Sequence, residues 1–466
     1  MFNKSINFLS FFMILFFISC EKEESASADP TDSTDTVEEV DPCAVDPVYV
    51  SFQSEIDAAS DGDTILVAPG TYEGNINFNG KNVVVASEYV TTGDSSYIKT
   101  TIIDAKQNGS VVRFENNETN QAALIGFTIT GGYAVKGAGI YISGGAEPTL
   151  SNLRVSGNST YICETDDYYD EAEGGGIYVN GGSPILEETT IRDNSSELNG
   201  GGLYFANTDL DLIYVTVVNN DALNWGGGLF TTTTNSKIKH TDISLNSASR
   251  GGAIYAQTFS DLIINNSTFS SNLVSDEGGA FHNTASTFDF VNVAVAYNES
   301  DGQGGAYFMN GTATYELMNV INLYNEPQDF YGANSGNFVK VDYSGVTGLL
   351  EGIEMNNSGD VQWGTGNIDD DGEENFSNGP HLCVYAFSND SGSASNKSQY
   401  SDAGNPSSLF NDIPYTDRWC AVDEYDAFTN QGLPGIDVTV DTSSNSQRND
   451  MGAYGGPQGG WKRNSR

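Results

Sequence analysis

The residue types that acid–base catalysis requires come together at one place in the sequence. His282 is preceded by Asp276 and Glu277, and Arg250 stands just before an earlier Gly-Gly pair. Such catalysis needs a base and a group that stabilises the developing charge, and this set supplies both. The chain has only three His, however, with no Gly-His-Gly and no Arg-x-Lys sequence. We therefore favour a packing role for His282 and keep catalysis as the alternative.

Two acidic segments have the oxygen ligands that Ca²⁺ prefers. Residues 159–173 contain a ten-residue insertion into the repeat described below and carry six acids and three Tyr. Residues 369–374 form a short acidic turn that lacks the distal Glu of a complete Ca²⁺ loop. Calcium is thus the one cofactor that the sequence offers, and plain acidic loops are the alternative. The candidate ligands are Asp166, Asp167, Asp170, Glu171, Asp369, Asp371 and Glu373.

A row of aromatic residues follows a repeated Gly-Gly-small-apolar unit, as in GGGLY at 200–204 and GGGLF at 226–230. In a strand the side chain next to an apolar core position points to the opposite face, so these rings are expected to point outward. At ~4.8 Å per coil, seven of them would form a ladder about 29 Å long. A glycan could stack on such a ladder; alternatively the rings only stabilise the sheet, or the ladder is buried. The row is Tyr141, Tyr178, Tyr204, Phe230, Tyr255, His282 and Phe308.

The elements that would position these residues repeat with a period of 26. Each repeat ends its apolar pattern on an Asn, and the ten-residue insertion separates the first two members of this series. Leucine-rich repeats share this spacing, but Gly costs about 1 kcal/mol in a helix, so a Gly-Gly pair in every repeat disfavours them. We predict an all-β, right-handed parallel β-helix in which the Asn amides stack and satisfy buried turn groups. The predicted Asn ladder is Asn158, Asn194, Asn220, Asn246, Asn272 and Asn298.

Three segments resemble known β-helix proteins. Residues 54–72 resemble the entry segment of the pectate-lyase-like superfamily, in which a short helix caps the first coil. The Gly-Gly and apolar-x-x-Asn units resemble the repeats of polymorphic outer-membrane proteins, and residues 402–404 and 449–454 resemble the closing segments of bacterial β-helix surface proteins. The resemblance implies the fold. A loop-rich C-terminal cap is expected because the end of a solenoid must be covered. The resemblance does not select an activity, because the superfamily mixes lyases, hydrolases, epimerases and non-catalytic adhesins.

The N-terminal segment predicts a lipid anchor. Residues 8–18 form an apolar run that is too short to span a bilayer and suits a signal peptide. The run leads to Cys20 in a sequence that resembles a bacterial lipobox, with Phe17 where Leu is usual. We therefore expect the chain to be lipid-anchored in the outer membrane. The next segment resembles the surface-export signal of Bacteroidota lipoproteins, which implies exposure on the cell surface; its residues are Lys22, Glu23 and Glu24.

Four Cys remain if Cys20 carries lipid, and four Cys allow three disulfide pairings. We prefer the pair Cys383–Cys420, because both lie in one C-terminal segment. Cys43 and Cys163 are then left to pair with each other.

The chain is acidic because basic residues are scarce: it has 63 Asp and Glu, 19 Lys and Arg, and a formal net charge of −44. A nucleic-acid partner needs a basic stripe, which this sequence lacks. The compact basic group at Lys237, Lys239 and His240 is typical of a charged outer face. An acidic polysaccharide is disfavoured unless a divalent cation bridges the like charges.

Together these observations predict a cell-surface lipoprotein whose β-helix presents an aromatic-lined face to a glycan or a partner protein, without catalysis. One alternative is a Ca²⁺-dependent polysaccharide lyase or glycoside hydrolase acting at the same face, with residues 159–173 as a wall of its cleft. Another is a structural subunit of an outer-membrane complex. The expected organisation is a signal peptide at 1–19, an acidic tether at 20–44, the β-helix at 45–325, and irregular final coils with a cap at 326–466.

Overall fold

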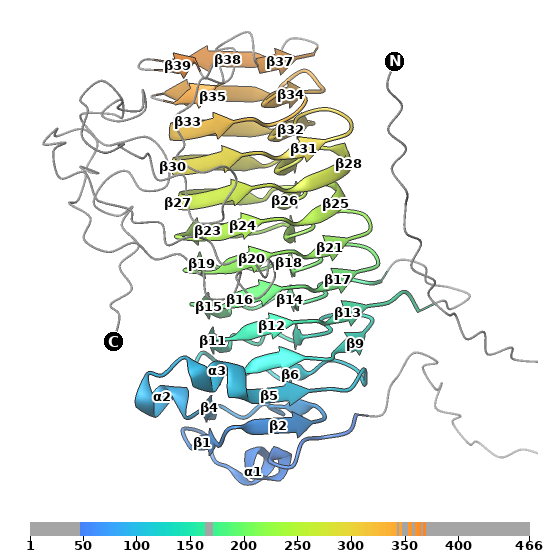
Figure 1. Ribbon diagram of the computed structural model, residues 1–466, viewed down its shortest axis with the longest axis vertical. Helices are drawn as coiled ribbons and strands as arrows, with labels where there is room; N and C mark the ends of the chain where they lie inside the picture. Colours follow the sequence, from blue (N-terminus) through green and yellow to red (C-terminus); the bar gives the residue numbers. More distant parts are fainter. Residues whose placement is uncertain are drawn as a thin grey trace, which may run out of the picture. The chain divides into compact units, whose positions relative to one another are not determined.

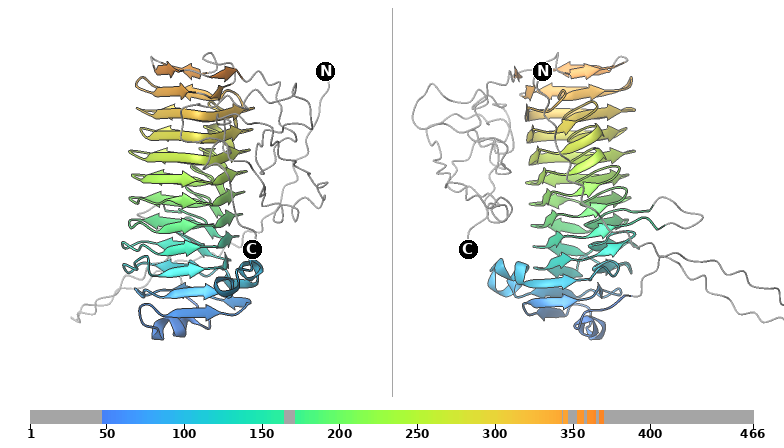
Figure 2. Two further views of the ribbon diagram at one scale, coloured as in Figure 1. Left: turned by 90° about the vertical axis from the view of Figure 1, so that its left-hand side faces the viewer. Right: turned by 45° about the vertical axis from the view of Figure 1, so that its right-hand side comes forward.

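The computed structural model describes residues 47–163, 171–342, 344–346, 353–356, 359–364 and 367–369. These residues form a right-handed parallel β-helix of about nine turns with coils of about 26 residues and very little helix, as predicted (Figure 1). Every pairing between its named strands is parallel and joins one coil to the next along the stack (Figure 2).

The strands form three sheets. Sheet I runs in two parallel columns that a turn separates, and these columns merge where one long strand serves both. Its strands are β1 (Thr64–Val67), β2 (Gly70–Glu73), β4 (Val84–Ser87), β5 (Thr101–Asp104), β7 (Ala123–Ile125), β8 (Thr128–Thr130), β11 (Thr149–Ser151), β12 (Arg154–Ser156), β15 (Ile185–Glu187), β16 (Thr190–Arg192), β19 (Leu212–Ile213), β20 (Thr216–Val218), β23 (Asn235–Lys239), β24 (Asp242–Ser244), β27 (Asp261–Ser270), β30 (Thr287–Ala296), β33 (Thr314–Leu323), β35 (Phe338–Asp342), β36 (Gly345–Val346), β38 (Asp360–Trp363) and β39 (Ile368–Asp369).

Sheets II and III complete each coil. Sheet II contains the Gly-Gly-apolar-aromatic units and consists of β3 (Ile76–Asn77), β6 (Val112–Phe114), β10 (Ile140–Ile142), β14 (Ile177–Asn180), β18 (Leu203–Ala206), β22 (Leu229–Thr232), β26 (Ile254–Gln257), β29 (Phe281–Thr284), β32 (Tyr307–Asn310), β34 (Phe330–Gly332) and β37 (Ile353–Met355). Sheet III consists of β9 (Tyr133–Ala134), β13 (Ser159–Thr160), β17 (Ser195–Ser196), β21 (Asp221–Ala222), β25 (Ser247–Arg250), β28 (Leu273–Glu277) and β31 (Glu299–Ser300). A typical coil runs through sheet I, sheet III and sheet II in that order.

The core consists of apolar side chains that stack on the same position of the next coil. In sheet II, for example, Ile177 pairs with Leu203 and Leu203 with Leu229, and all three side chains are buried. The exact register is maintained because a slip of one residue would turn every core side chain outward.

The Asn residues form a continuous hydrogen-bonded ladder inside the turn between sheets I and III. Asn194 Nδ2 donates to Asn220 Oδ1 at 3.0 Å and to the Val155 carbonyl at 3.0 Å. The Asn194 backbone N–H also donates to Asn220 Oδ1, at 3.1 Å. The buried amides therefore satisfy both their neighbours and the turn. The same bonds join Asn158, Asn194, Asn220, Asn246, Asn272, Asn298 and Asn325.

The Gly-Gly pairs make the corner that leads into sheet II. The first Gly of a unit has a positive φ, as at Gly226 (69°), which an L side chain adopts only with strain. A Cβ on the second, Gly227, would lie 2.4 Å from the Ser247 carbonyl oxygen of the next coil. The corner therefore requires Gly for conformation at one position and for space at the next.

Helix α1 (Gln53–Ala58) covers the first coil, where the sequence predicted a capping helix. Its Ile56 side chain is fully buried, and Gln53 donates to the Asn77 carbonyl at 2.8 Å and accepts from the Asn77 N–H at 3.0 Å. Two further short helices, α2 (Tyr89–Thr92) and α3 (Ser96–Thr100), precede β5. No helix in the described ranges is long and apolar enough to cross a membrane.

Candidate functional site

The aromatic row forms a single stack along the outer side of sheet II. Ring centroids of successive coils are 5.1 Å apart for Tyr178 and Tyr204, and 4.9 Å apart for Tyr204 and Phe230, with interplanar angles of 13° and 11°. The parallel register of the strands causes this stacking, because it places each ring directly against the ring of the next coil. The ring ladder consists of Tyr141, Tyr178, Tyr204, Phe230, Tyr255, His282, Phe308 and Tyr331.

The expectation that the ladder exposes its ring faces is wrong. Each face lies against the next ring, and the interior rings are nearly inaccessible, with exposed fractions of 9% for Tyr204 and 1% for His282. The rings do point away from the main core, as alternation predicts, and form a separate buried cluster. At one end the Arg113 guanidinium lies 4.3 Å from the Tyr141 ring centroid. A ligand therefore cannot stack on the interior ring faces.

A second column of side chains lies beside the rings. Each member of this column comes five residues before a ring of the ladder. The Gly corner lies between the two residues and turns the chain, which places the earlier side chain over the ladder. Backbone bridges join successive members coil by coil. The Trp225 ring, for example, stacks 5.0 Å from Tyr255. We call this column the cover row: Lys136, Glu173, Asn199, Trp225, Arg250, Glu277 and Gln303.

The first part of the cover row is a charged group beside the insertion. Lys136 Nζ lies 2.9 Å from Glu171 Oε1, 4.0 Å from Glu173 Oε2 and 5.6 Å from the Tyr178 ring centroid. Burial raises the pKa of the Glu173 carboxyl, and Lys136 and the Tyr204 hydroxyl only partly offset this effect. Burial and the neighbouring Glu173 likewise raise the pKa of Tyr204.

The structure brings together the four residues that the sequence suggested for catalysis. Arg250 on β25 donates from Nε to Asp276 Oδ2 at 2.6 Å, and the same Nε lies 3.4 Å from Glu277 Oε2. His282 Nε2 lies 3.5 Å from Glu277 Oε2. Contact with His282 and then Arg250 lowers the pKa of Glu277, although its burial acts in the opposite direction. The set is thus one charged cluster at the middle of the cover row.

His282 itself lies beneath this cluster. Its ring is sandwiched between Tyr255 at 4.5 Å and Phe308 at 4.8 Å, and burial lowers its pKa. Its 3.5 Å separation from Glu277 exceeds the usual N–H···O hydrogen-bond length of about 2.9 Å. A group this buried cannot contact a substrate, so any catalytic contribution of His282 would act by positioning Glu277.

The remaining predicted residues are dispersed. Lys237 lies on β23 of sheet I, where its side chain is 51% exposed, and the turn after β23 holds His240. The His240 ring stacks 4.7 Å from Tyr214, and burial lowers its pKa to about 4.

Cys163 is disulfide-bonded. The other predicted Cys, the signal and export residues, and most predicted Ca²⁺ ligands lie outside the described residues: Cys20, Lys22, Glu23, Glu24, Cys43, Asp166, Asp167, Asp170, Asp371, Glu373, Cys383 and Cys420.

Among the predicted Ca²⁺ ligands, Asp369 ends β39 and Glu171 pairs with Lys136. Within the described residues no group of three or more His, Cys, Asp or Glu side chains could hold a metal ion. Calcium at the predicted segments stays a prediction.

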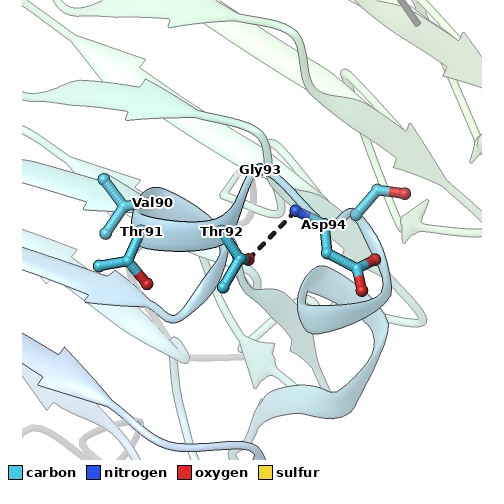
Figure 3. A pocket seen from close by; sticks show the side chains of 6 residues that line it. Val90, Thr91, Thr92, Gly93 and Asp94 are labelled. Atoms are coloured by element: carbon cyan, nitrogen blue, oxygen red, sulfur yellow. Dashed lines mark hydrogen bonds between the residues drawn. The ribbon is translucent and has the colours of Figure 1, made fainter. Parts of the chain in front are cut away.

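In the described part of the chain, hollows also occur away from the cover row. One, at the turn between α2 and α3, is lined by residues 90–95 alone, and there the Asp94 N–H donates to Thr92 Oγ1 at 3.1 Å (Figure 3). It comes from one continuous segment and gathers no groups from elsewhere in the fold. Another is a groove on the outer face of sheet I, lined by several coils. Sequence reasoning missed this groove, because its residues share no motif.

No protein-family model matches the chain, and no curated protein or solved structure is significantly similar to it. The fold and surface define its class as a right-handed parallel β-helix with an internal Asn ladder and a stacked ring ladder beneath a polar cover row.

Proposed function

We propose that this chain is a lipid-anchored outer-membrane protein that binds a glycan at the cell surface through the cover row, without catalysis. Its fold type includes non-catalytic adhesins as well as enzymes. The resemblance of the sequence around Cys20 to a lipobox, and that of the following residues to a Bacteroidota export signal, support the anchor and the surface location. A Cys20→Ala change is expected to move the chain from the membrane fraction to the soluble fraction.

The central part of the cover row carries the proposal. Trp225 is only partly buried, and its neighbours in the row are Asn199 and Arg250. An indole beside an amide and a guanidinium offers the apolar surface and the directional hydrogen bonds that bind a sugar. The rigid ring ladder beneath holds these groups in place, so that little ordering is needed on binding.

A glycan-array measurement on soluble residues 41–466 tests the proposal. Trp225→Ala and Arg250→Ala should each weaken binding at least tenfold, because each removes a direct contact. Leu223→Ala is the matched control, since Leu223 is 65% exposed on the same loop and lies outside the cover row. Equal binding by all three variants, with unchanged circular dichroism, would show that the glycan does not bind here. Binding of a protein rather than any glycan would move the function to partner recognition.

The charged cluster favours one second candidate, cleavage of a polysaccharide at the same face. Arg250 and Asp276 are the most exposed of the four residues, with side chains 35% and 42% exposed. If the protein is a Ca²⁺-dependent lyase, unsaturated sugar products will form with Ca²⁺ present, and Arg250→Ala will abolish them while glycan retention persists. Retention without product in either condition supports the binding function.

A further inference from the structure

The groove on sheet I is not used by the proposed function. It crosses β15, β19, β23 and β27 and has a volume of about 710 Å³. Its lining includes aliphatic side chains, of which Ile185 and Ile263 are each 40% exposed. Three of the four coils contribute such side chains to one hollow that is open to solvent. The apolar lining residues are Pro184, Ile185, Ile213 and Ile263.

The lining of the groove is also negatively charged. It carries Asp209, Asp211 and Asp261 against one Lys. The Nζ of this residue, Lys237, lies 3.9 Å from Asp211 Oδ2. Both side chains are well exposed, so the pair neutralises little charge. On the next coil Asp289 pairs in register with Ile263, and its pKa is raised by burial and then by Glu316 and Asp261. This face therefore favours a cationic occupant with an apolar group.

One segment of the chain has this chemistry. Residues 459–466 read Gly-Gly-Trp-Lys-Arg-Asn-Ser-Arg, the densest run of basic residues in a chain whose net charge is −44. Trp461 stands directly before the basic residues Lys462, Arg463 and Arg466. The segment lies outside the described residues.

The connection is long enough to bring this segment to the groove. About 90 residues separate the end of β39 at Asp369 from Gly459. At ~3.3 Å per residue, a connection of that length can reach at most roughly 300 Å, so its length does not keep the segment from the groove. The groove lies about four to seven coils from the last coil, or roughly 20–35 Å at ~4.8 Å per coil. Tethering at this length makes even a weak contact favourable, because the effective concentration is high.

We propose that residues 461–466 bind in the acidic groove of sheet I of the same chain. Trp461 packs on the aliphatic lining residues, and the basic side chains pair with the neighbouring carboxylates. The contact neutralises the crowded acids and removes the exposed Ile185 and Ile263 from water. It is independent of the glycan site, because the groove belongs to sheet I and the cover row lies over sheet II.

Trypsin cleavage after Lys462 and Arg463 in the full-length chain, in detergent, measures whether the segment is bound. The Asp209→Asn/Asp211→Asn/Asp261→Asn variant should be cleaved at least threefold faster than the wild type, relative to cleavage after Lys397 in the same chain. High salt should accelerate the wild type similarly and the variant little. The matched control is Asp193→Asn/Glu197→Gln/Asp221→Asn, which removes three acids near sheet III and should leave the rate unchanged.

A zero-length carbodiimide cross-link gives a second readout that does not depend on mutation. In the wild-type monomer Lys462 should couple mainly to Asp209, Asp211 or Asp261. Coupling of Lys462 to carboxylates spread over the chain, or an equal cleavage rate in both triple variants, would overturn the proposal. Coupling only in cross-linked dimers would also overturn it, because the occupant would then come from a second copy.

Discussion

Asp242 shows how the stacking of coils changes the chemistry of a single side chain. Thr268 of the next coil donates to its Oδ1 at 2.6 Å, and Ser244 donates to its Oδ2 at 3.0 Å. Both hydroxyls favour the ionised carboxylate, yet burial outweighs them and raises the pKa of Asp242 to about 6. The fold therefore holds this acid in an environment that disfavours its charge.

Replacing Asp242 should consequently stabilise the protein at neutral pH. The folded-state pKa of about 6 exceeds the ordinary value of 3.8, so the folded chain takes up a proton that the unfolded chain does not as the pH falls through this window. Wild-type stability thus rises between pH 6 and pH 4 relative to Asp242→Asn. At about 1.4 kcal/mol per pKa unit, the variant gains at most about 3 kcal/mol at pH 7.

Urea midpoints of both proteins at pH 7 and pH 4 measure this difference. The control is Asp193→Asn, two coils away, which alters a partly exposed carboxylate that accepts from Asn219 and should show no such change. A stability difference between wild type and Asp242→Asn that is the same at both pH values would contradict the raised pKa.

Tyr204 lies in the middle of the ring ladder, with one ring stacked on each face. Tyr204→Ala should lower the free energy of unfolding by about 3–4 kcal/mol, because it leaves a cavity between two rings. Tyr204→Phe retains the stack and loses only the hydroxyl contact with Glu173, so about 1 kcal/mol is expected. Urea denaturation of the two variants measures these losses. Equal stability of Tyr204→Ala and wild type would show that the ladder contributes no packing energy.

At the scale of elements, the parts of the fold that the backbone itself demands were predictable from the sequence. The corner needs Gly, because one position has a positive φ and the next has no room for a Cβ. The buried turn needs an Asn amide. Each requirement therefore repeats the same residue type in the sequence once per coil. The repeated pattern therefore predicted the solenoid, six members of the Asn ladder and seven members of the ring ladder.

The features that sequence reasoning missed depend on contacts that the period does not encode. Strand alternation places the rings outside the core, but it does not show that the residue five positions earlier folds over them. Asn325 and Tyr331 extend the two ladders but were missed, because the last Asn step has 27 residues and the Gly-Gly unit is absent before Tyr331.

The Asn ladder makes a prediction at this scale. Asn220→Ala should lower the free energy of unfolding by several kcal/mol, because it leaves the Ile191 carbonyl and the Asn194 amide without their buried partner. Asn235→Ala is the matched control, since Asn235 is exposed and its side-chain amide donates to Asp209, another exposed residue of the groove. Urea denaturation compares them. Similar losses for both variants would show that the ladder bonds are no stronger than surface bonds.

At the scale of the whole molecule, a solenoid lacks the protection that a closed fold gives to its end strands. Each coil contacts only its neighbours, so the first and last coils expose unpaired backbone unless another element covers them. Here α1 covers the first coil with Phe52 and Ile56, which are 4% and 0% exposed. The same coil has Leu66 pointing outward at 49% exposure, so the helix covers only the interior of the coil end.

Removing this cap should therefore convert the soluble chain into an associating one. A chain that starts at residue 60 lacks α1 and exposes the apolar interior of the first coil together with the free edges of β1 and β3. We expect it to form dimers or larger assemblies in size-exclusion chromatography with light scattering, despite the repulsion that its net charge of −34 (17 Lys and Arg, 51 Asp and Glu) supplies. A chain that starts at residue 47 keeps the helix and should stay monomeric. If both chains are monomers, the charge alone prevents association, and high salt, which screens that charge, should then cause only the shorter chain to associate.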